Sequence, residues 1–199
     1  MYRMILASGN AHKLEEIQAI LKDFDIDLVS MADVGLKGYE IIEDGDTFEA
    51  NAMIKAKAVM NKLGVDAIAD DSGLMVDYLS GAPGIYSARY SGENATAESN
   101  NVKLKEALKD VPDSKRTARF VSVISVAFAD GRELTVRGEC EGVIGYAEKG
   151  NQGFGYDPLF IVPDKNLTFA ELTSEEKNAI SHRANALEKL KVELPKMMR

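Results

Sequence analysis

The spacing of apolar residues near the N-terminus predicts a strand, a helix and a second strand. Residues 4–7 form a short apolar run, and apolar positions then recur every three or four residues over 13–21, as on the buried side of a helix. Asn10 stands before this pattern as a candidate N-cap, and the acidic stretch 23–27 marks its end. A second β-rich run begins at Ile26. The opening is therefore typical of an α/β fold.

The next segment predicts a helix followed by a buried strand. Asp46 and Glu49 have the spacing of a capping box ahead of a helix that begins near Phe48, and a glycine stands where that helix would stop. Residues 65–69 form an apolar run that predicts a strand, and the polar sequence Asp70-Asp71-Ser72-Gly73 follows it. We therefore expect chemistry at the end of this strand.

The second half of the chain predicts an antiparallel part of the same sheet. Residues 117–128 are rich in β-branched and aromatic residues, Asp130-Gly131 is a turn signal, and alternation resumes over 134–136. The other elements expected are a helix over 97–108, a strand over 159–162, and a helical region that opens at a Thr173/Glu176 capping box. Together these patterns predict one α/β domain over residues 1–199 with a mixed sheet.

Composition narrows the class of protein. No apolar run approaches the roughly 18 residues that a membrane span needs, and the N-terminus lacks the pattern of a secretory signal. The single Cys140 cannot form an internal disulfide, so we expect a reducing, cytoplasmic setting. The net charge of −8 opposes attraction to nucleic acid or to other polyanions. A phosphorylated ligand would therefore need a local positive site.

The sequence SGNAHK, residues 8–13, is the first candidate site. Backbone N–H groups at the start of a helix can bind phosphate, and Lys13 would add a positive charge beside it. A strand–helix turn with a solvated lysine explains the segment equally well. The Walker phosphate-binding pattern is absent.

Two adjacent carboxylates, Asp70 and Asp71, form the second candidate. They should repel each other unless a cation or hydrogen bonds compensate. Mg²⁺ prefers a few carboxylates together with waters and substrate phosphates, so one aspartate and a glutamate from the acidic loop 40–46 would suit it. The alternative, an aspartate that caps a turn beside a solvated one, is slightly favoured by the dipeptide alone.

Two further motifs have the chemistry to hold a nucleobase. In residues 153–158, GFGYDP, Phe154 stands between glycines where its ring could stack on a base. Donors from Lys177 and from 181–183 would pair with the C6 carbonyl of inosine or xanthosine and oppose the C6 amino group of adenine. The alternatives are a turn whose aromatic rings enter the core, and a helix-terminal cluster of salt bridges.

Taken together, these motifs resemble the inosine-triphosphate pyrophosphatase family, also called the Ham1-like family. The resemblance covers nearly the whole chain, in the blocks SGNAHKLEEI, EDGDTFEANA, IADDSGLMVDYLSGAPGIYSARYSG, GFGYDPLF and AELTSEEKNAISHRANAL. It implies a long mixed sheet flanked by helices, with two lobes around a central nucleotide-binding cleft, and a homodimer. It also implies Mg²⁺-dependent hydrolysis of ITP, dITP or XTP at the α–β phosphoanhydride, which keeps these nucleotides out of DNA and RNA.

The same resemblance implies roles for individual residues. Asp71 would be the general base and a metal ligand, and Asp70 would support the site without binding the metal. Glu43 would be the second metal ligand, favoured over Glu40 and Asp44 by alignment on Gly45. The residues expected to bind substrate are Ser8, Gly9, Asn10, Ala11, His12, Lys13, Ser72, Phe154, Gly155, Tyr156, Asp157, Lys177, His182 and Arg183.

Two rival functions follow from the same residues. A Maf-like pyrophosphatase would act on modified pyrimidine nucleotides, although the SHR and GFGYDP sequences argue against it. A nucleotide-binding sensor would bind its ligand without hydrolysing it, although the Asp70-Asp71 pair beside Lys13 makes that reading weaker. Measuring pyrophosphate release would separate an enzyme from a sensor that binds its nucleotide without hydrolysing it.

Overall fold

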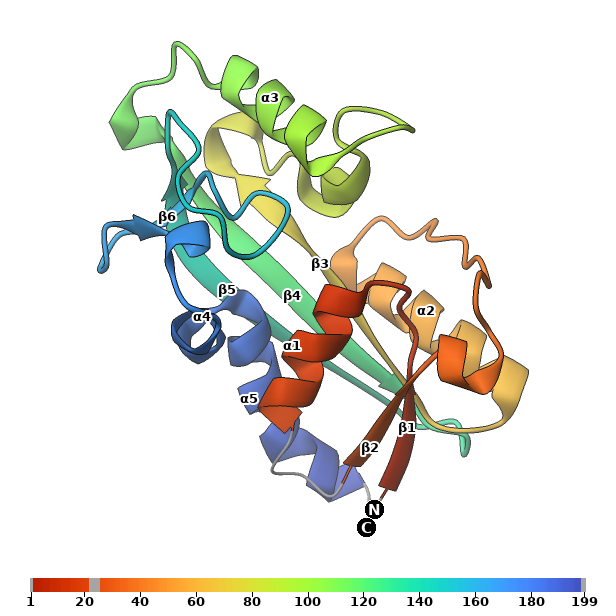
Figure 1. Ribbon diagram of the computed structural model, residues 1–199. Coiled ribbons are helices and arrows are strands. Elements are labelled where there is room, and N and C mark those ends of the chain that lie inside the picture. Colours follow the sequence, from red (N-terminus) through yellow and green to blue (C-terminus); the bar gives the residue numbers. More distant parts are fainter. Residues whose placement is uncertain (1, 22–25, 198–199) are drawn as a thin grey trace. The chain divides into compact units, whose positions relative to one another are not determined.

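The computed structural model describes residues 2–21 and 26–197. Its strands are β1 (Tyr2–Leu6), β2 (Ile26–Ser30), β3 (Ala67–Val76), β4 (Thr117–Ala127), β5 (Glu133–Ile144), β6 (Phe160–Val162) and β7 (Leu167–Thr168). Its α-helices are α1 (Ala11–Leu21), α2 (Phe48–Leu63), α3 (Ala97–Ala107), α4 (Ser174–Ile180) and α5 (His182–Met197). Figure 1 shows these elements along the chain. Part of the predicted helix-end signal, residues 23–25, lies outside the described residues.

The strands of the described residues form one seven-stranded sheet in the order β2-β1-β3-β4-β5-β6-β7. β1 pairs in parallel with β2 and with β3, whereas β6 pairs antiparallel with both β5 and β7. The predicted mixed sheet is therefore confirmed. No helix in the described part of the chain has the length and apolar character to cross a bilayer.

The chain divides into two compact units. Unit 1 contains Met1–Asp71, Ser122–Gly138 and Arg183–Arg199, and unit 2 contains Ser72–Val121 and Glu139–His182. The division falls inside β3, β4 and β5, so each of these long strands supplies residues to both units.

The core of unit 1 explains the apolar run near the N-terminus. Met4 and Leu6 belong to a buried cluster with residues of α1 and α5, whereas Ile5 and Ala7 belong to a second cluster with residues of α2. Successive side chains of a strand point to opposite faces, so β1 is covered by helices on both sides, as Figure 1 shows. A strand covered on both faces has a continuous apolar sequence rather than an alternating one.

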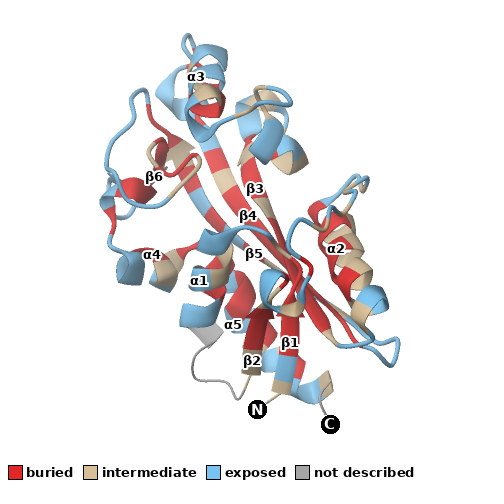
Figure 2. Cartoon of the chain, turned by 45° about the vertical axis from the view of Figure 1, so that its right-hand side comes forward, coloured by how far each residue is buried: buried red, intermediate tan, exposed pale blue. Residues whose placement is uncertain are grey.

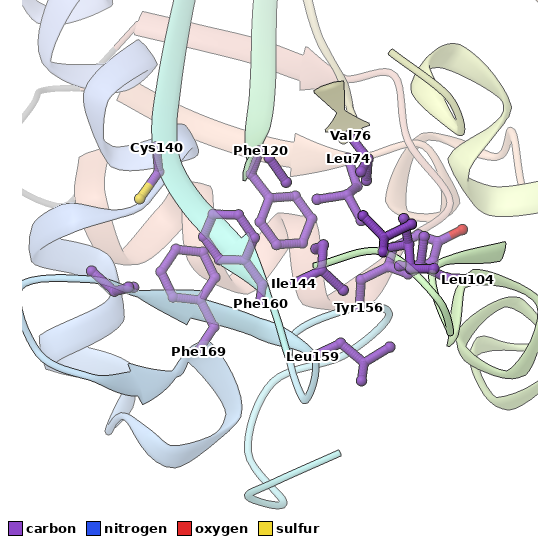
Figure 3. Close-up of a cluster of buried hydrophobic side chains, with 14 of the residues drawn as sticks. Leu74, Val76, Leu104, Phe120, Cys140, Ile144, Tyr156, Leu159, Phe160 and Phe169 are labelled. Carbon is purple, nitrogen blue, oxygen red and sulfur yellow. The ribbon is translucent and has the colours of Figure 1, made fainter. Parts of the chain in front are cut away.

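The core of unit 2 is built around three aromatic rings. The ring centroids of Phe120 and Phe160 are 4.6 Å apart, and those of Phe160 and Phe169 are 4.9 Å apart. Phe160 is tilted against both of the other rings, whereas Phe120 and Phe169 are nearly parallel. Figure 3 shows the three rings together, with aliphatic side chains beside them. In Figure 2, β3 and β4 are buried over most of their length, whereas β5 alternates between buried and more exposed positions and the helices carry exposed as well as buried residues.

Several predicted helix ends and turns are confirmed. The side chain of Asn10 accepts hydrogen bonds from the backbone N–H groups of His12 and Lys13 at 3.0 and 3.3 Å, as an N-cap does. Thr173 forms the predicted capping box with Glu176. In the β4–β5 connection, the backbone N–H of Gly131 donates to Phe128 at 2.9 Å, which closes the predicted hairpin turn.

Two local predictions are wrong. The cap of α2 is Thr47, whose hydroxyl accepts from the backbone N–H of Ala50 at 3.1 Å, and not Asp46. The helix begins at Phe48, so the residue directly before it occupies the extended N-cap position. The strand predicted to end before Asp70 instead continues to Val76. A strand can contain a carboxylate when other groups of the protein compensate its charge, which is the case here.

Candidate active site

The segment 8–13 contains part of the turn after β1 and the first three residues of α1, and it lies mostly at the surface. Asn10 donates its backbone N–H to the hydroxyl of Ser8 at 3.1 Å, which tightens the turn. Lys13 is not a solvated lysine, because its Nζ contacts Asp70 Oδ2 at 2.7 Å and its side chain is only 15% exposed. The loop therefore presents a helix start and a lysine that a buried carboxylate holds in place.

Asp70 is buried and is surrounded by donors. Besides Lys13, the hydroxyl of Ser122 donates to Oδ1 at 2.6 Å, and the guanidinium of Arg183 reaches both oxygens at 3.3 Å. Burial alone would raise the pKa of Asp70, but the charges of Arg183 and Lys13 and the hydrogen bonds outweigh it and hold the pKa well below its usual value. Asp70 therefore anchors two cations, Lys13 and Arg183.

Asp71 lies in different surroundings. Its Oδ1 accepts from Nζ of Lys55 at 2.8 Å, and the same Nζ donates to Glu43 Oε2 at 2.7 Å. Oδ2 of Asp71 is buried and has no hydrogen-bond partner among the residues that the structure describes. Burial raises the pKa of Asp71, although Lys55 opposes the rise. Consecutive residues of a strand point to opposite faces, which explains why the two aspartates have separate partners and do not repel each other at close range.

Glu43 and Asp71 fit a Mg²⁺ site. A buried carboxylate oxygen without a partner is costly unless a ligand completes it, and Asp71 Oδ2 is such an atom. The side chain of Glu43 is 33% exposed, so an ion has access from its side. Within the described residues no third His, Cys, Asp or Glu joins the pair. Mg²⁺ usually keeps waters and binds substrate phosphates besides one or two carboxylates, and Glu43 and Asp71 could supply those carboxylates.

Lys55 contacts Glu43 and Asp71, and the motifs did not identify it as a residue of this site. It lies on the buried side of α2, 8% exposed, in the same stripe as Ala52, Ala56 and Val59. A lysine at a core-facing helical position is unusual, because burying a charge is costly without a partner. The position of a lysine within the apolar stripe of a predicted helix was the feature of the sequence that could have identified Lys55.

In unit 2, Asp157 organises the glycine-rich loop. Its Oδ2 accepts from Nζ of Lys177 and from the backbone N–H of Phe154, each at 2.8 Å. The same Nζ lies 4.8 Å from the centre of the Phe154 ring. At Gly153, where φ is +71°, an added Cβ would come within 2.1 Å of Asp157 Oδ2, so only glycine fits. The loop is therefore held in one conformation by a buried ion pair.

The two aromatic residues of this loop differ. Tyr156 enters the core of unit 2 and donates its hydroxyl to the backbone oxygen of Ser87 at 2.7 Å. Phe154 is only half-buried and lines a cavity of about 490 Å³ beside α3. Gly155 accepts from Asn101 Nδ2 at 3.1 Å, which fixes the loop against α3. Of the two rings, that of Phe154 is the one exposed enough to meet a ligand.

His182 and Arg183 are consecutive but belong to different units. The imidazole of His182 is stacked on Phe120, with ring centroids 4.8 Å apart. Arg183 is 1% exposed and pairs with Asp70 and with Glu16. Ser72, which begins unit 2, is half-buried. The structure thus places the predicted residues in a group in unit 1 around Lys13, Asp71 and Arg183, and a group in unit 2 around Phe154, Asp157 and Lys177.

Comparisons with known proteins identify the family of this chain. The dITP/XTP pyrophosphatase of Clostridium perfringens is 53% identical over 96% of both chains, and that of Shigella flexneri is 51% identical over 96% of both. The structure of the Staphylococcus aureus Ham1 protein matches with a TM-score of 0.88 at 39% identity, over 98% of this chain and 99% of that one. A HAM1 protein from Coxiella burnetii matches with a TM-score of 0.89 at 42% identity, over 98% and 100%. The sequence profile described as the Ham1 family matches residues 4–193, and this chain therefore belongs to the Ham1 family.

Proposed function

We propose that this chain hydrolyses non-standard purine nucleoside triphosphates, namely dITP, XTP and ITP, to the monophosphate and pyrophosphate. The relatives named dITP/XTP pyrophosphatase support this assignment. The observation that carries it is the buried Oδ2 of Asp71, which lacks a partner in the described structure while Lys55 and Glu43 lie beside it. We further propose that the protein acts as a homodimer in the cytoplasm, where it keeps these nucleotides out of DNA and RNA.

Glu43 and Asp71 would hold the Mg²⁺ of this reaction. The ion would neutralise phosphate charge and polarise the phosphoryl oxygens. Asp71 would orient the attacking water and accept its proton as the water oxygen bonds to the α-phosphorus and the α–β linkage breaks. A carboxylate positioned in this way can act as a general base toward the bound water.

Lys13 and the turn at residues 8–13 would bind the triphosphate. Most of the rate of phosphoryl transfer comes from positioning and charge stabilisation, and a lysine fixed by Asp70 is positioned before substrate arrives. In this respect the ion pair between Lys13 and Asp70 has a function beyond stability. Ser72 would also contact the substrate.

The base would be recognised by residues of unit 2. The half-buried ring of Phe154 offers a surface for stacking, and Lys177 and His182 would supply donors to the C6 carbonyl. Adenine carries a donor at C6, so its binding would leave donors facing one another. Sites built on such a hydrogen bond discriminate by roughly 10⁴–10⁵.

One panel of substrates tests the proposal. ITP, dITP, XTP, ATP, GTP and dUTP are incubated with the protein in Mg²⁺ and in EDTA, and pyrophosphate and orthophosphate are measured separately. We expect pyrophosphate from the first three, only with Mg²⁺, at rates at least about 100-fold above ATP. Equal rates on ATP and ITP would contradict the proposed selectivity. Release from pyrimidine nucleotides would favour the Maf-like alternative, and binding without release would favour a sensor.

A further inference from the structure

Lys55 occupies the position between the two carboxylates assigned to the metal. Its Nζ lies 2.7 Å from Glu43 Oε2 and 2.8 Å from Asp71 Oδ1. The side chain of Lys55 is 11% exposed and that of Asp71 is 12% exposed. Its backbone belongs to the middle of α2, a helix capped at both ends by Thr47 and Gly64. The helix α2 therefore holds the ammonium group of Lys55 in place between the carboxylates of Glu43 and Asp71.

Each carboxylate uses one oxygen on Lys55 and keeps the other for a further ligand. Asp71 Oδ2 has no hydrogen-bond partner among the described residues, and within the same part of the chain the hydrogen bond and ion pair of Glu43 with Lys55 use Oε2 and leave Oε1 for a further ligand. Two carboxylates held by one cation are brought to a fixed separation without the repulsion that they would otherwise have. The two carboxylates are therefore already in place before a metal ion binds, and Asp71 Oδ2 and Glu43 Oε1 remain available as metal ligands.

The same lysine weakens the attraction of this pair for a second cation. Two carboxylates and one ammonium have a net charge of −1, whereas the carboxylates alone have −2. In a partly buried site, like charges a few ångströms apart interact strongly. The phosphates of a nucleotide would supply the missing negative charge and give the ammonium another partner.

We propose that Lys55 is a built-in counter-ion that holds Glu43 and Asp71 ready in the metal-free protein and thereby makes uptake of the divalent ion depend on the nucleotide. This inference rests on the metal site of the proposed function. In the nucleotide-free protein the ammonium occupies the space between the carboxylates and the divalent ion binds weakly. With the triphosphate bound, the ion and Lys55 share the carboxylate and phosphate oxygens.

Mn²⁺ binding followed by electron paramagnetic resonance tests the proposal without any turnover. The wild type is compared with Lys55→Met, Lys55→Gln and Lys55→Arg, first without nucleotide and then with an ITP analogue that has a methylene group between the α- and β-phosphorus atoms. Lys57→Met is the matched control, because Lys57 lies on the same helix and pairs with Glu133 at the surface. It removes the same charge without touching the carboxylates.

Without nucleotide, we expect Lys55→Met and Lys55→Gln to bind Mn²⁺ at least about tenfold more tightly than the wild type, since a nearby positive charge is removed. Lys55→Arg and Lys57→Met should stay near the wild type. The analogue should tighten Mn²⁺ binding strongly in the wild type and much less in Lys55→Met. Equal or weaker Mn²⁺ binding in Lys55→Met, or a wild type that binds Mn²⁺ equally well with and without the analogue, would overturn the proposal.

Thermal unfolding in EDTA and in Mg²⁺ gives a second readout. Lys55→Met should lose stability in EDTA, where its two carboxylates lack a counter-ion, and regain it in Mg²⁺, whereas the wild type should barely respond to Mg²⁺ alone. If Lys55→Met does not fold in EDTA, Lys55→Gln is measured in its place. A failed substrate panel with these metal titrations intact would reject the proposed hydrolysis alone. Hydrolysis without the expected Mn²⁺ behaviour would reject the role of Lys55 alone.

Discussion

The two consecutive aspartates of β3 show how one residue type acquires opposite properties. Asp70 receives Lys13, Ser122 and Arg183 on its two oxygens, and its pKa is held well below the usual value. Asp71 shares Lys55 with Glu43, keeps one buried oxygen without a partner in the described structure, and has a raised pKa. A carboxylate whose oxygens are all used by the protein organises its neighbours, whereas one with an oxygen left over can bind an ion or take a proton.

The largest expected effect is on turnover in Asp71→Asn. The amide cannot act as a base and binds a divalent ion poorly, so kcat for ITP should fall by about 10³-fold or more. The fold should survive, because Lys55 keeps Glu43 as a partner. Pyrophosphate release and a thermal melt measure the two effects. Near-normal ITP hydrolysis by this variant would remove Asp71 from the mechanism.

Asp70→Asn should instead lose stability first. Removing the charge leaves Arg183 and Lys13 around a neutral amide, and breaking a buried ion pair in this way costs about 3–5 kcal/mol of unfolding free energy. Urea unfolding of Asp70→Asn and Asp71→Asn side by side measures the difference. If Asp71→Asn were the more destabilised of the two, the distinction between an organising and a reactive aspartate would be wrong.

In unit 2, Asp157 resembles Asp70, because Lys177 and the backbone of Phe154 both use its Oδ2. Gly153→Ala drives a Cβ against that oxygen, so we expect KM for ITP to rise by about tenfold or more as the loop shifts. Gly155→Ala is the control: its φ is also positive, at +62°, but nothing lies within 4 Å of the added Cβ. It should cost only the backbone strain of about 1 kcal/mol. Similar KM values for both variants would show that Asp157 does not position Phe154.

The pH dependence of stability should have opposite signs for the two aspartates. The lowered pKa of Asp70 gives stability that is present above the unfolded value of 3.8 and is lost as the pH falls through the folded pKa. The raised pKa of Asp71 makes the folded state the better proton binder, so its contribution declines as the pH rises from 3.8 through the folded pKa. Urea titrations across the acid range should show the first dependence disappear in Asp70→Asn and the second in Asp71→Asn. Curves that change in the same direction in both variants would contradict these assignments.

The smallest effect is expected from Lys57→Met. Lys57 and Glu133 form an ion pair with side chains 43% and 46% exposed, and such surface pairs contribute about 0–1 kcal/mol. Its unfolding free energy and ITP turnover should both stay close to those of the wild type. A large loss of activity would show that charge on α2 acts at long range and that Lys55 has no special position.

Much of the secondary structure was predictable because it depends on neighbouring residues. The Asn10 cap, the Thr173 capping box and the β4–β5 turn each involve groups within a few residues of one another. The predicted end of β3 was wrong because it depends on residues that are distant in the sequence. Two aspartates ordinarily stop a buried strand, and only distant partners such as Arg183 allow Asp70 to lie within it.

The sequence by itself determined the family, the mixed α/β sheet and the residues that carry the motifs, because apolar spacing and local motifs involve residues that are close together in the sequence. The tertiary structure decided what each charge does. Lys13, Lys55 and Arg183 pair with carboxylates across separations of up to 167 residues, and the alternation of β3 turns Asp70 and Asp71 to different partners. Which charges meet depends on how strands and helices pack, so the difference in partners between Asp70 and Asp71 appears only in the folded chain.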